Sequence, residues 1–345
     1  MTRTCAVAYR QRRRGLTRIE VIVLILILGL LACFFVPATR SSRRAARKVQ
    51  CLSDMRNIAL AMHNYGSDNS GELLPLVSKQ SITNSSGQQG TMTAPWPLLL
   101  LPALDNAARL MNIRNNAVIV GDVATINLEP GFDNVTVYGF TCADSPAYKQ
   151  PGGFSFIVNA GHMPQGVWGT VTNNAPDLID WYEAPSPGDA NDIEVGLATG
   201  VVWPEGYVSS LEYVATGDGI STTILLTENL QAGNWYDTQT SDLGFGVQLP
   251  VSLEASYPNA GATTDLLMLK QAPSSDNWFI NRNRSAARGN APRPSSNHHG
   301  GVNVVMADGS AKFLSENMDK AVFMKLVTPN GIAYGEQKLS ASAFR

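Results

Sequence analysis

Residues 12–37 read RRRGLTRIEVIVLILILGLLACFFVP, and this stretch decides how the rest of the chain is arranged. The sixteen residues from Val21 to Val36 carry no polar side chain. Counted from Leu16 to Val36, the segment would be about 31 Å long as a helix, which matches a hydrocarbon layer of ~30 Å. It lacks the shorter apolar region and the small-residue cleavage site of a secretory signal peptide. We therefore expect residues 16–37 to form a retained transmembrane helix.

One carboxylate, Glu20, lies inside this segment, four residues after Leu16. A lone charged side chain at the centre of a membrane helix costs about 2.5–3.5 kcal/mol on insertion scales, so it is expected to have a partner. Cleavage between Gly15 and Leu16 would create an α-amine for that role, at a helix N-terminus whose dipole also favours an anion. The alternative is an ordinary signal anchor in which the glutamate has no such role.

These residues resemble the N-terminus of type IV prepilins and of type II secretion pseudopilins. The resemblance lies in residues 15–20 (GLTRIE), the apolar run after them, and Pro37. It implies that a prepilin peptidase cleaves between Gly15 and Leu16 and methylates the new Leu16 amine. It also implies that Glu20 pairs with the amine of a neighbouring subunit, and that the helix bends at Pro37.

The charged residues are distributed unevenly along the chain. Residues 1–15 contain five arginines and no acid, residues 16–48 contain six bases and one acid, and the remainder holds 15 bases against 27 acids. An acidic globular part does not suit nucleic acid, which binds to a basic face. The bases from Arg40 to Lys48 lie either against acidic neighbours or lipid headgroups, or on a solvated helix face.

Charge alone does not orient the apolar segment, because arginines flank it on both sides. The prepilin resemblance implies that residues 1–15 are a cleaved basic leader with a cytoplasmic N-terminus. It also places the globular domain outside the bacterial cytoplasmic membrane, with a single pass between the two.

Residues 38–65 continue the helical pattern, with apolar residues on one face only. We expect an amphipathic spine that ends near Gly66 and packs on a sheet. Residues 66–345 contain short strand-like runs separated by turn residues, which favours an exported, antiparallel β-rich domain. The expected fold class is therefore α+β and pilin-like. We predict a loop over 78–95, helices over 96–111 and 319–327, and strands at 117–120, 123–128, 135–141, 154–159, 166–171, 193–203, 224–226, 302–306 and 311–314.

Two of the four cysteines, Cys51 and Cys142, fall in the part of the chain expected to be exported. An oxidising compartment would allow a disulfide between them. Their pairing stays open at this point, because the sequence does not supply the Cα separation that a bridge requires.

Four further segments are similar to a large, uncharacterised family of bacterial prepilin-like proteins that is named for a C-terminal His-x9-Asp-Gly motif. The segments are residues 51–65 (CLSDMRNIALAMHNY), Cys142-Ala-Asp-Ser-Pro, the run from Asp218 to Glu228, and His298 with Asp308-Gly309. The resemblance implies a pilin-like fold and no established biochemical role.

Four side chains are candidates for a metal site. His298, Asp308, Asp218 and Glu228 offer imidazole and carboxylate ligands of the kind that zinc or calcium takes. However, Asp308-Gly309 also forms an ordinary hairpin turn, and a histidine beside glycines can bond to neighbouring backbone. Structural roles are therefore favoured, and no cofactor is firmly predicted.

The chain contains no motif of a hydrolase, a metalloprotease or a nucleotide-binding enzyme, so we predict no enzymatic activity. The predicted function is that of a structural pilin- or pseudopilin-like subunit that assembles with other pilin-like subunits through its N-terminal helix. The alternative is a monomeric, membrane-tethered protein whose β domain binds carbohydrate or peptide with exposed aromatic side chains. The aromatic residues considered are Trp168, Trp181, Trp203, Trp235, Trp278, Tyr182, Tyr207 and Tyr236.

Overall fold

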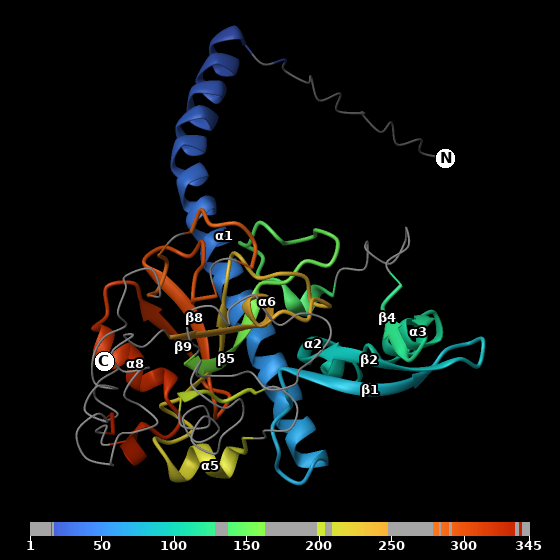
Figure 1. Cartoon of the computed structure of the whole chain (residues 1–345). Helices are drawn as coiled ribbons and strands as arrows, with labels where there is room; N and C mark the ends of the chain where they lie inside the picture. Colours follow the sequence, from blue (N-terminus) through green and yellow to red (C-terminus); the bar gives the residue numbers. More distant parts are fainter. Residues whose placement is uncertain are drawn as a thin grey trace, which may run out of the picture. The chain divides into compact units, whose positions relative to one another are not determined.

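The computed structural model describes residues 15, 17–127, 137–162, 199–203, 209–247, 279–282, 284–289, 292–334 and 338–339. The chain divides into two compact units, residues 1–46 and 47–345. Helix α1 (Arg18–Asp68) begins in the first unit and continues into the second (Figure 1). All the other described helices and strands belong to the second unit, so the core and the candidate site are features of that unit.

Helix α1 begins with reciprocal hydrogen bonds between Thr17 and Glu20. The backbone N–H of Thr17 donates to Oε2 of Glu20 over 2.7 Å, and the N–H of Glu20 donates to Oγ1 of Thr17 over 3.4 Å. This is a capping box, which satisfies backbone N–H groups left free at the start of the helix. Glu20 therefore has a local role in helix initiation that the sequence analysis did not anticipate.

The expected transmembrane half of the helix is contradicted. Side chains of α1 are described over residues 18–31 and 43–68. Within the described part of the chain, no helix is both long and apolar enough to cross a membrane. The predicted pilin-like fold class, which rested on this helix, is therefore wrong.

The described strands form two sheets. The first has the order β1-β2-β4-β3 and contains β1 (Val77–Thr83), β2 (Gln89–Pro95), β3 (Val118–Val120) and β4 (Val123–Thr125). The second has the order β7-β5-β6-β8-β9 and contains β5 (Phe156–His162), β6 (Ile224–Glu228), β7 (Gly244–Val247), β8 (Gly301–Met306) and β9 (Ala311–Ser315).

Both sheets are mixed, which corrects the prediction of an antiparallel domain. Strands β2 and β4 are parallel, as are β5 and β7, while the other neighbouring strands are antiparallel. A parallel pair needs a long crossover connection instead of a tight turn. The α+β class holds, with two mixed sheets in place of one antiparallel sheet.

The helices that follow α1 are short. They are α2 (Trp96–Leu100), η1 (Pro102–Leu104), α3 (Ala107–Asn115), η2 (Tyr138–Phe140), α5 (Leu211–Thr216), α6 (Thr240–Leu243), α8 (Lys320–Val327) and η6 (Gly331–Tyr334). The predicted helix over 96–111 is interrupted at Pro102, as proline's missing N–H requires. The predicted closing helix is confirmed as α8, where the Asp319 side chain accepts the N–H groups of Ala321 and Val322.

Several local predictions are wrong. Residues 78–95 form the antiparallel β1–β2 hairpin instead of a loop, and Asn84 closes its turn by accepting the N–H groups of Ser86 and Gln88. Polar residues on the exposed face of β1 hid this strand from the sequence pattern. Residues 138–140 of the expected strand 135–141 form the 3-10 helix η2, and residues 199–203 are not a strand. The expected strand at 166–171 lies outside the described residues.

The second half of α1 provides one side of the core. Met55, Ile58, Ala59 and Met62 repeat at helical spacing and are fully buried. Every residue of the central strands β6 and β8 is also buried. The predicted apolar stripe of the spine is therefore confirmed only from residue 51 onward, because Val49 is 65% exposed.

Asp242, in helix α6, is 9% exposed. Burial, and then repulsion from Asp237, raise its pKa from 3.8 to about 6 against the opposing attraction of Arg288. The native carboxyl holds its proton more tightly than the unfolded one, so its stabilising contribution is complete below pH ~4 and is lost as the pH rises through about 6. We expect Asp242→Asn to raise the free energy of unfolding by about 1–2 kcal/mol at pH 7 and by little at pH 4. Urea titrations at both pH values test this, and an equal gain at both would contradict the electrostatic cause.

Candidate functional site

A buried carboxylate, Glu228, lies at the end of strand β6. Its Oε2 accepts the backbone N–H of Asn303 over 2.9 Å, and its Oε1 lies 3.0 Å from Nδ2 of Asn303 and 3.0 Å from Nε2 of His298. Asn303 reaches this position because β6 and β8 are neighbouring strands. Glu228 is 1% exposed, and a buried carboxylate is stable only when such donors replace the lost water.

His298 faces a carboxylate with each of its ring nitrogens. Nε2 lies 3.0 Å from Oε1 of Glu228, and Nδ1 lies 3.3 Å from Oδ2 of Asp144. A ring that carries a proton on each nitrogen donates to both carboxylates at once. The loop before β8 holds the residue in place, because Oγ of Ser296 accepts the N–H of His298 and donates to the carbonyl of Gly301.

Asp144 connects this histidine to the surface. Its Oδ1 forms an ion pair with Nε of Arg47 over 2.9 Å, and its backbone carbonyl accepts a hydrogen bond from Nδ2 of Asn297 over 2.7 Å. The Arg47 side chain is 46% exposed and that of Asp144 is 15% exposed. A continuous series of polar contacts therefore leads from the half-exposed Arg47, through Asp144 and His298, to the buried Glu228.

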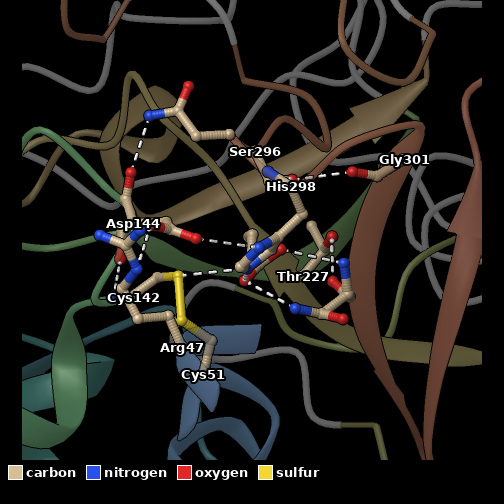
Figure 2. A network of polar contacts seen from close by, with 12 residues as sticks. Arg47, Cys51, Cys142, Asp144, Thr227, Ser296, His298 and Gly301 are labelled. Atoms are coloured by element: carbon tan, nitrogen blue, oxygen red, sulfur yellow. Dashed lines mark hydrogen bonds and ion pairs between the residues drawn. A yellow bond between two sulfur atoms is a disulfide. The ribbon is translucent and has the colours of Figure 1, made fainter. Parts of the chain in front are cut away.

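A disulfide lies beside the histidine. Cys51 of α1 and Cys142, which follows η2, are bonded with a Cα–Cα separation of 4.9 Å, inside the usual range for a bridge. Sγ of Cys142 lies 3.4 Å from Nε2 of His298. Figure 2 shows the disulfide, Arg47 and Asp144 on one side of His298 and Thr227 on the other.

We call Arg47, Cys51, Cys142, Asp144, Glu228, His298 and Asn303 the buried cluster. Its sulfur atoms, imidazole and Glu228 carboxylate are shielded from solvent. Cys51, Cys142, Glu228 and His298 are each at most 6% exposed. A catalytic nucleophile or base must be reachable by its substrate, and sulfur atoms bonded to each other are neither nucleophilic thiolates nor metal ligands. In the disulfide form, the contacts of the cluster therefore have a structural role. They join α1, β6, β8 and the segment after η2.

The structure brings together two of the four predicted metal candidates. His298 and Glu228 are in direct contact. Asp218 instead caps helix η6, where it accepts the N–H groups of Gly331 and Ile332, and burial raises its pKa despite these bonds. Asp308 accepts the N–H of Ser310 in the β8–β9 turn.

The His-x9-Asp-Gly motif therefore has two separate structural roles. His298 enters the buried cluster before β8, and Asp308-Gly309 makes the turn after it. Gly309 has a φ of +78°, a value that favours glycine. The spacing between the two parts follows from the length of strand β8 and its flanking loop.

Sequence reasoning missed Asp144, Arg47 and Asn303 as members of the cluster. Asp144 is two residues from Cys142. Once the disulfide is known, Asp144 is therefore expected to lie near the other members of the cluster. Arg47 is four residues before Cys51 and lies on the same helix face. The basic residues at the end of the 40–48 stretch are thus not simply solvated, because Lys48 also places Nζ 3.3 Å from the ring centroid of Phe313.

The structure describes only part of the predicted processing site. Gly15 is exposed, Leu16 lies outside the described residues, and Pro37 lies within α1 at a position whose side chain is not described. Glu20 is exposed at the start of α1. Cleavage, methylation and pairing of Glu20 stay predictions.

The aromatic residues considered for ligand binding do not form a described surface. Trp203 and Trp235 are 1% and 2% exposed, so they belong to the core. Tyr236 is partly buried and packs against the ring of Trp235. Trp168, Trp181, Trp278, Tyr182 and Tyr207 lie outside the described residues.

Comparison with known proteins identifies a family. The model of the family described as "Protein of unknown function (DUF1559)" matches residues 40–321, which is most of the chain. No curated protein and no solved structure matches the chain. The matched segment contains every residue of the buried cluster.

Proposed function

We propose that this chain, which belongs to the DUF1559 family of proteins of unknown function, is a pilin- or pseudopilin-like structural subunit. It is processed between Gly15 and Leu16 by a prepilin peptidase, which methylates the new amine. It acts outside the cytoplasmic membrane and assembles with other pilin-like subunits through the apolar residues 19–31 of α1.

The exposed apolar surface of α1 carries the proposal. The large apolar side chains from Ile19 to Leu31 are 40–70% exposed. A continuous apolar surface of this kind marks a contact with a partner or a lipid, because it is costly to leave in water. Glu20 is the single acidic residue in this stretch, and it gives a subunit contact a defined register through its pairing with a Leu16 amine.

The disulfide supports export. Disulfides persist in oxidising compartments such as the bacterial periplasm and the cell surface, and are rare in a reducing cytoplasm. The bond between Cys51 and Cys142 therefore favours an extracytoplasmic second unit. This agrees with the orientation that a cleaved basic leader at residues 1–15 implies.

Two substitutions at Glu20 separate assembly from helix capping. Glutamine completes a capping box as glutamate does, but it has no charge for an amine partner. We therefore expect Glu20→Gln to abolish assembly as completely as Glu20→Ala, while both variants are still cleaved and exported. The measurement is cross-linking in intact cells that contain a prepilin peptidase, followed by separation of monomers from assemblies.

Asp68→Asn is the matched control, because Asp68 is an exposed carboxylate at the other end of α1. It should assemble normally. Normal assembly of Glu20→Gln together with failure of Glu20→Ala would mean that Glu20 acts only as a helix cap, and the proposed pairing with the Leu16 amine would be withdrawn. Absence of assemblies of the wild-type chain would overturn the subunit proposal itself.

A second candidate function, binding of a carbohydrate or peptide, is favoured by one pocket. The pocket has a volume of about 460 Å³ and lies beside β2 and β4, with Met92, Ile126, Tyr236, Asp237, Gln239 and Asp242 among its lining residues. An aromatic ring beside several hydrogen-bonding groups is a common arrangement for such ligands. If this is the function, full-length protein should retain an oligosaccharide or a peptide from a mixed library, and Tyr236→Ala should release it.

A further inference from the structure

We infer that the thiol form of the buried cluster is a zinc site, with the Cys51 and Cys142 thiolates, Glu228 and His298 as ligands to one ion per chain. When the disulfide is reduced, the two sulfur atoms become separate ligands. They then join an imidazole and a carboxylate that are already in place. The cluster therefore has two alternative cross-links, a disulfide and a metal ion.

The positions of the ligand atoms support this inference. One ligand atom from each of the four residues lies within 4.8 Å of the others. Tetrahedral zinc with bonds of about 2.0–2.3 Å places its ligand atoms about 3.3–3.8 Å apart. Nε2 of His298 already lies 3.4 Å from Sγ of Cys142 and 3.0 Å from Oε1 of Glu228. Small side-chain movements therefore suffice to enclose an ion.

The surrounding groups are also those of a metal site. A zinc-bound histidine commonly donates its other ring N–H to a carboxylate, which fixes its orientation. Oδ2 of Asp144 lies 3.3 Å from Nδ1 of His298 and occupies that position. Asn303 donates two hydrogen bonds to Glu228 and holds the second non-sulfur ligand. All four ligand residues are buried, as in structural zinc sites that leave no open position for a substrate.

The conversion balances with a dithiol as the reductant. The dithiol transfers two electrons and two protons to the disulfide, which yields two thiols on the chain and a disulfide in the reductant. Zinc then displaces the two thiol protons as it binds. The two cysteines are in the thiol form wherever the chain meets a reducing environment, including the cytoplasm before export.

Cobalt binding tests the inference directly. The full-length protein is prepared in detergent with Cys5→Ser and Cys33→Ser, so that only Cys51 and Cys142 remain. The protein is reduced with a dithiol, and the reductant is then removed under anaerobic conditions. The reduced protein is titrated with Co²⁺ and then with Zn²⁺. We expect the thiolate-to-cobalt absorption band to saturate at one ion per chain and to disappear on addition of zinc. The disulfide form should show no such band.

Substitutions around the site give the expected ranking of affinities. Asp144→Asn should weaken zinc binding by about 10–100-fold, because it removes the partner that orients the ligating histidine. His298→Gln should weaken it further, because it removes a ligand. His63→Gln is the matched control, because His63 bonds to the carbonyl of Ala307 away from the cluster, and it should bind cobalt normally.

Thermal unfolding of the reduced protein covers the case in which reduction disturbs the fold. Zinc should raise the unfolding temperature of the thiol form and leave that of the disulfide form unchanged, because a ligand stabilises only the state that binds it. No thiolate band, equal binding by His298→Gln, or a reduced chain that zinc fails to stabilise or refold would each overturn the inference.

Discussion

Removing the disulfide between Cys51 and Cys142 will lower the free energy of unfolding of the second unit by about 4–5 kcal/mol. The bond closes a loop between residues 91 positions apart. In the chain-entropy model, a loop of this size restricts the unfolded chain by about 4.6 kcal/mol at 25 °C. The native state also loses the covalent link between α1 and the segment that carries Asp144.

Alanine substitutions measure this effect by urea unfolding under oxidising conditions. Cys51→Ala and Cys142→Ala should each lose most of the 4–5 kcal/mol, and the double variant should be no less stable than the worse single variant, because one bond is lost in all three. The Cys5→Ser and Cys33→Ser variant is the control and should unfold like the wild type. Additive losses at the two sites would mean that the thiols contribute separately and that the bond is not formed.

Removing the carboxylate of Glu228 will destabilise the second unit by about 3–5 kcal/mol. The Glu228→Ala variant leaves the imidazole of His298 and both donors of Asn303 without their acceptor in a buried site. A buried polar group without a partner loses its hydration and regains nothing. Glu228→Gln should cost less, because its amide oxygen still accepts one of these hydrogen bonds.

Glu316→Ala is the matched control. Glu316 also accepts a hydrogen bond from an asparagine, Nδ2 of Asn281 at 2.7 Å, but it is only partly buried, so its loss should cost less than about 1 kcal/mol. A double-mutant cycle between Glu228→Ala and His298→Ala should give a coupling of about 1–3 kcal/mol. Equal losses for Glu228→Ala and Glu316→Ala would contradict the role of burial in this cluster.

The parts of the fold that the sequence predicted share strong local signals. Strands β6, β8 and β9 are short apolar runs beside clear turn residues, and the buried stripe of α1 follows a helical period from Cys51 to Met62. The β1–β2 hairpin was missed because its exposed face is polar. The parallel pairings were missed because local patterns do not show which strands become neighbours.

The candidate site was predicted only in part. Glu228 and His298 stood out as ionisable residues within motifs, but Asp218 and Asp308 looked equally suitable. Asp218 instead caps helix η6, and Asp308 accepts a hydrogen bond within the β8–β9 turn. The sequence did not decide whether Cys51 and Cys142 form a disulfide, because the distance between them depends on the packing of α1. Asp144 and Arg47 have no motif of their own, and their roles emerge only when the disulfide fixes their neighbourhood.

The intact mass of the protein purified from its native cells, measured with and without reductant, tests the proposed processing and export most directly. We predict the mass of a chain that begins at Leu16 and carries one methyl group, lower by two hydrogen atoms until reductant restores them at Cys51 and Cys142. A mass that retains residues 1–15 would remove the free amine that Glu20 needs and would contradict the proposal of a processed, exported and assembling subunit.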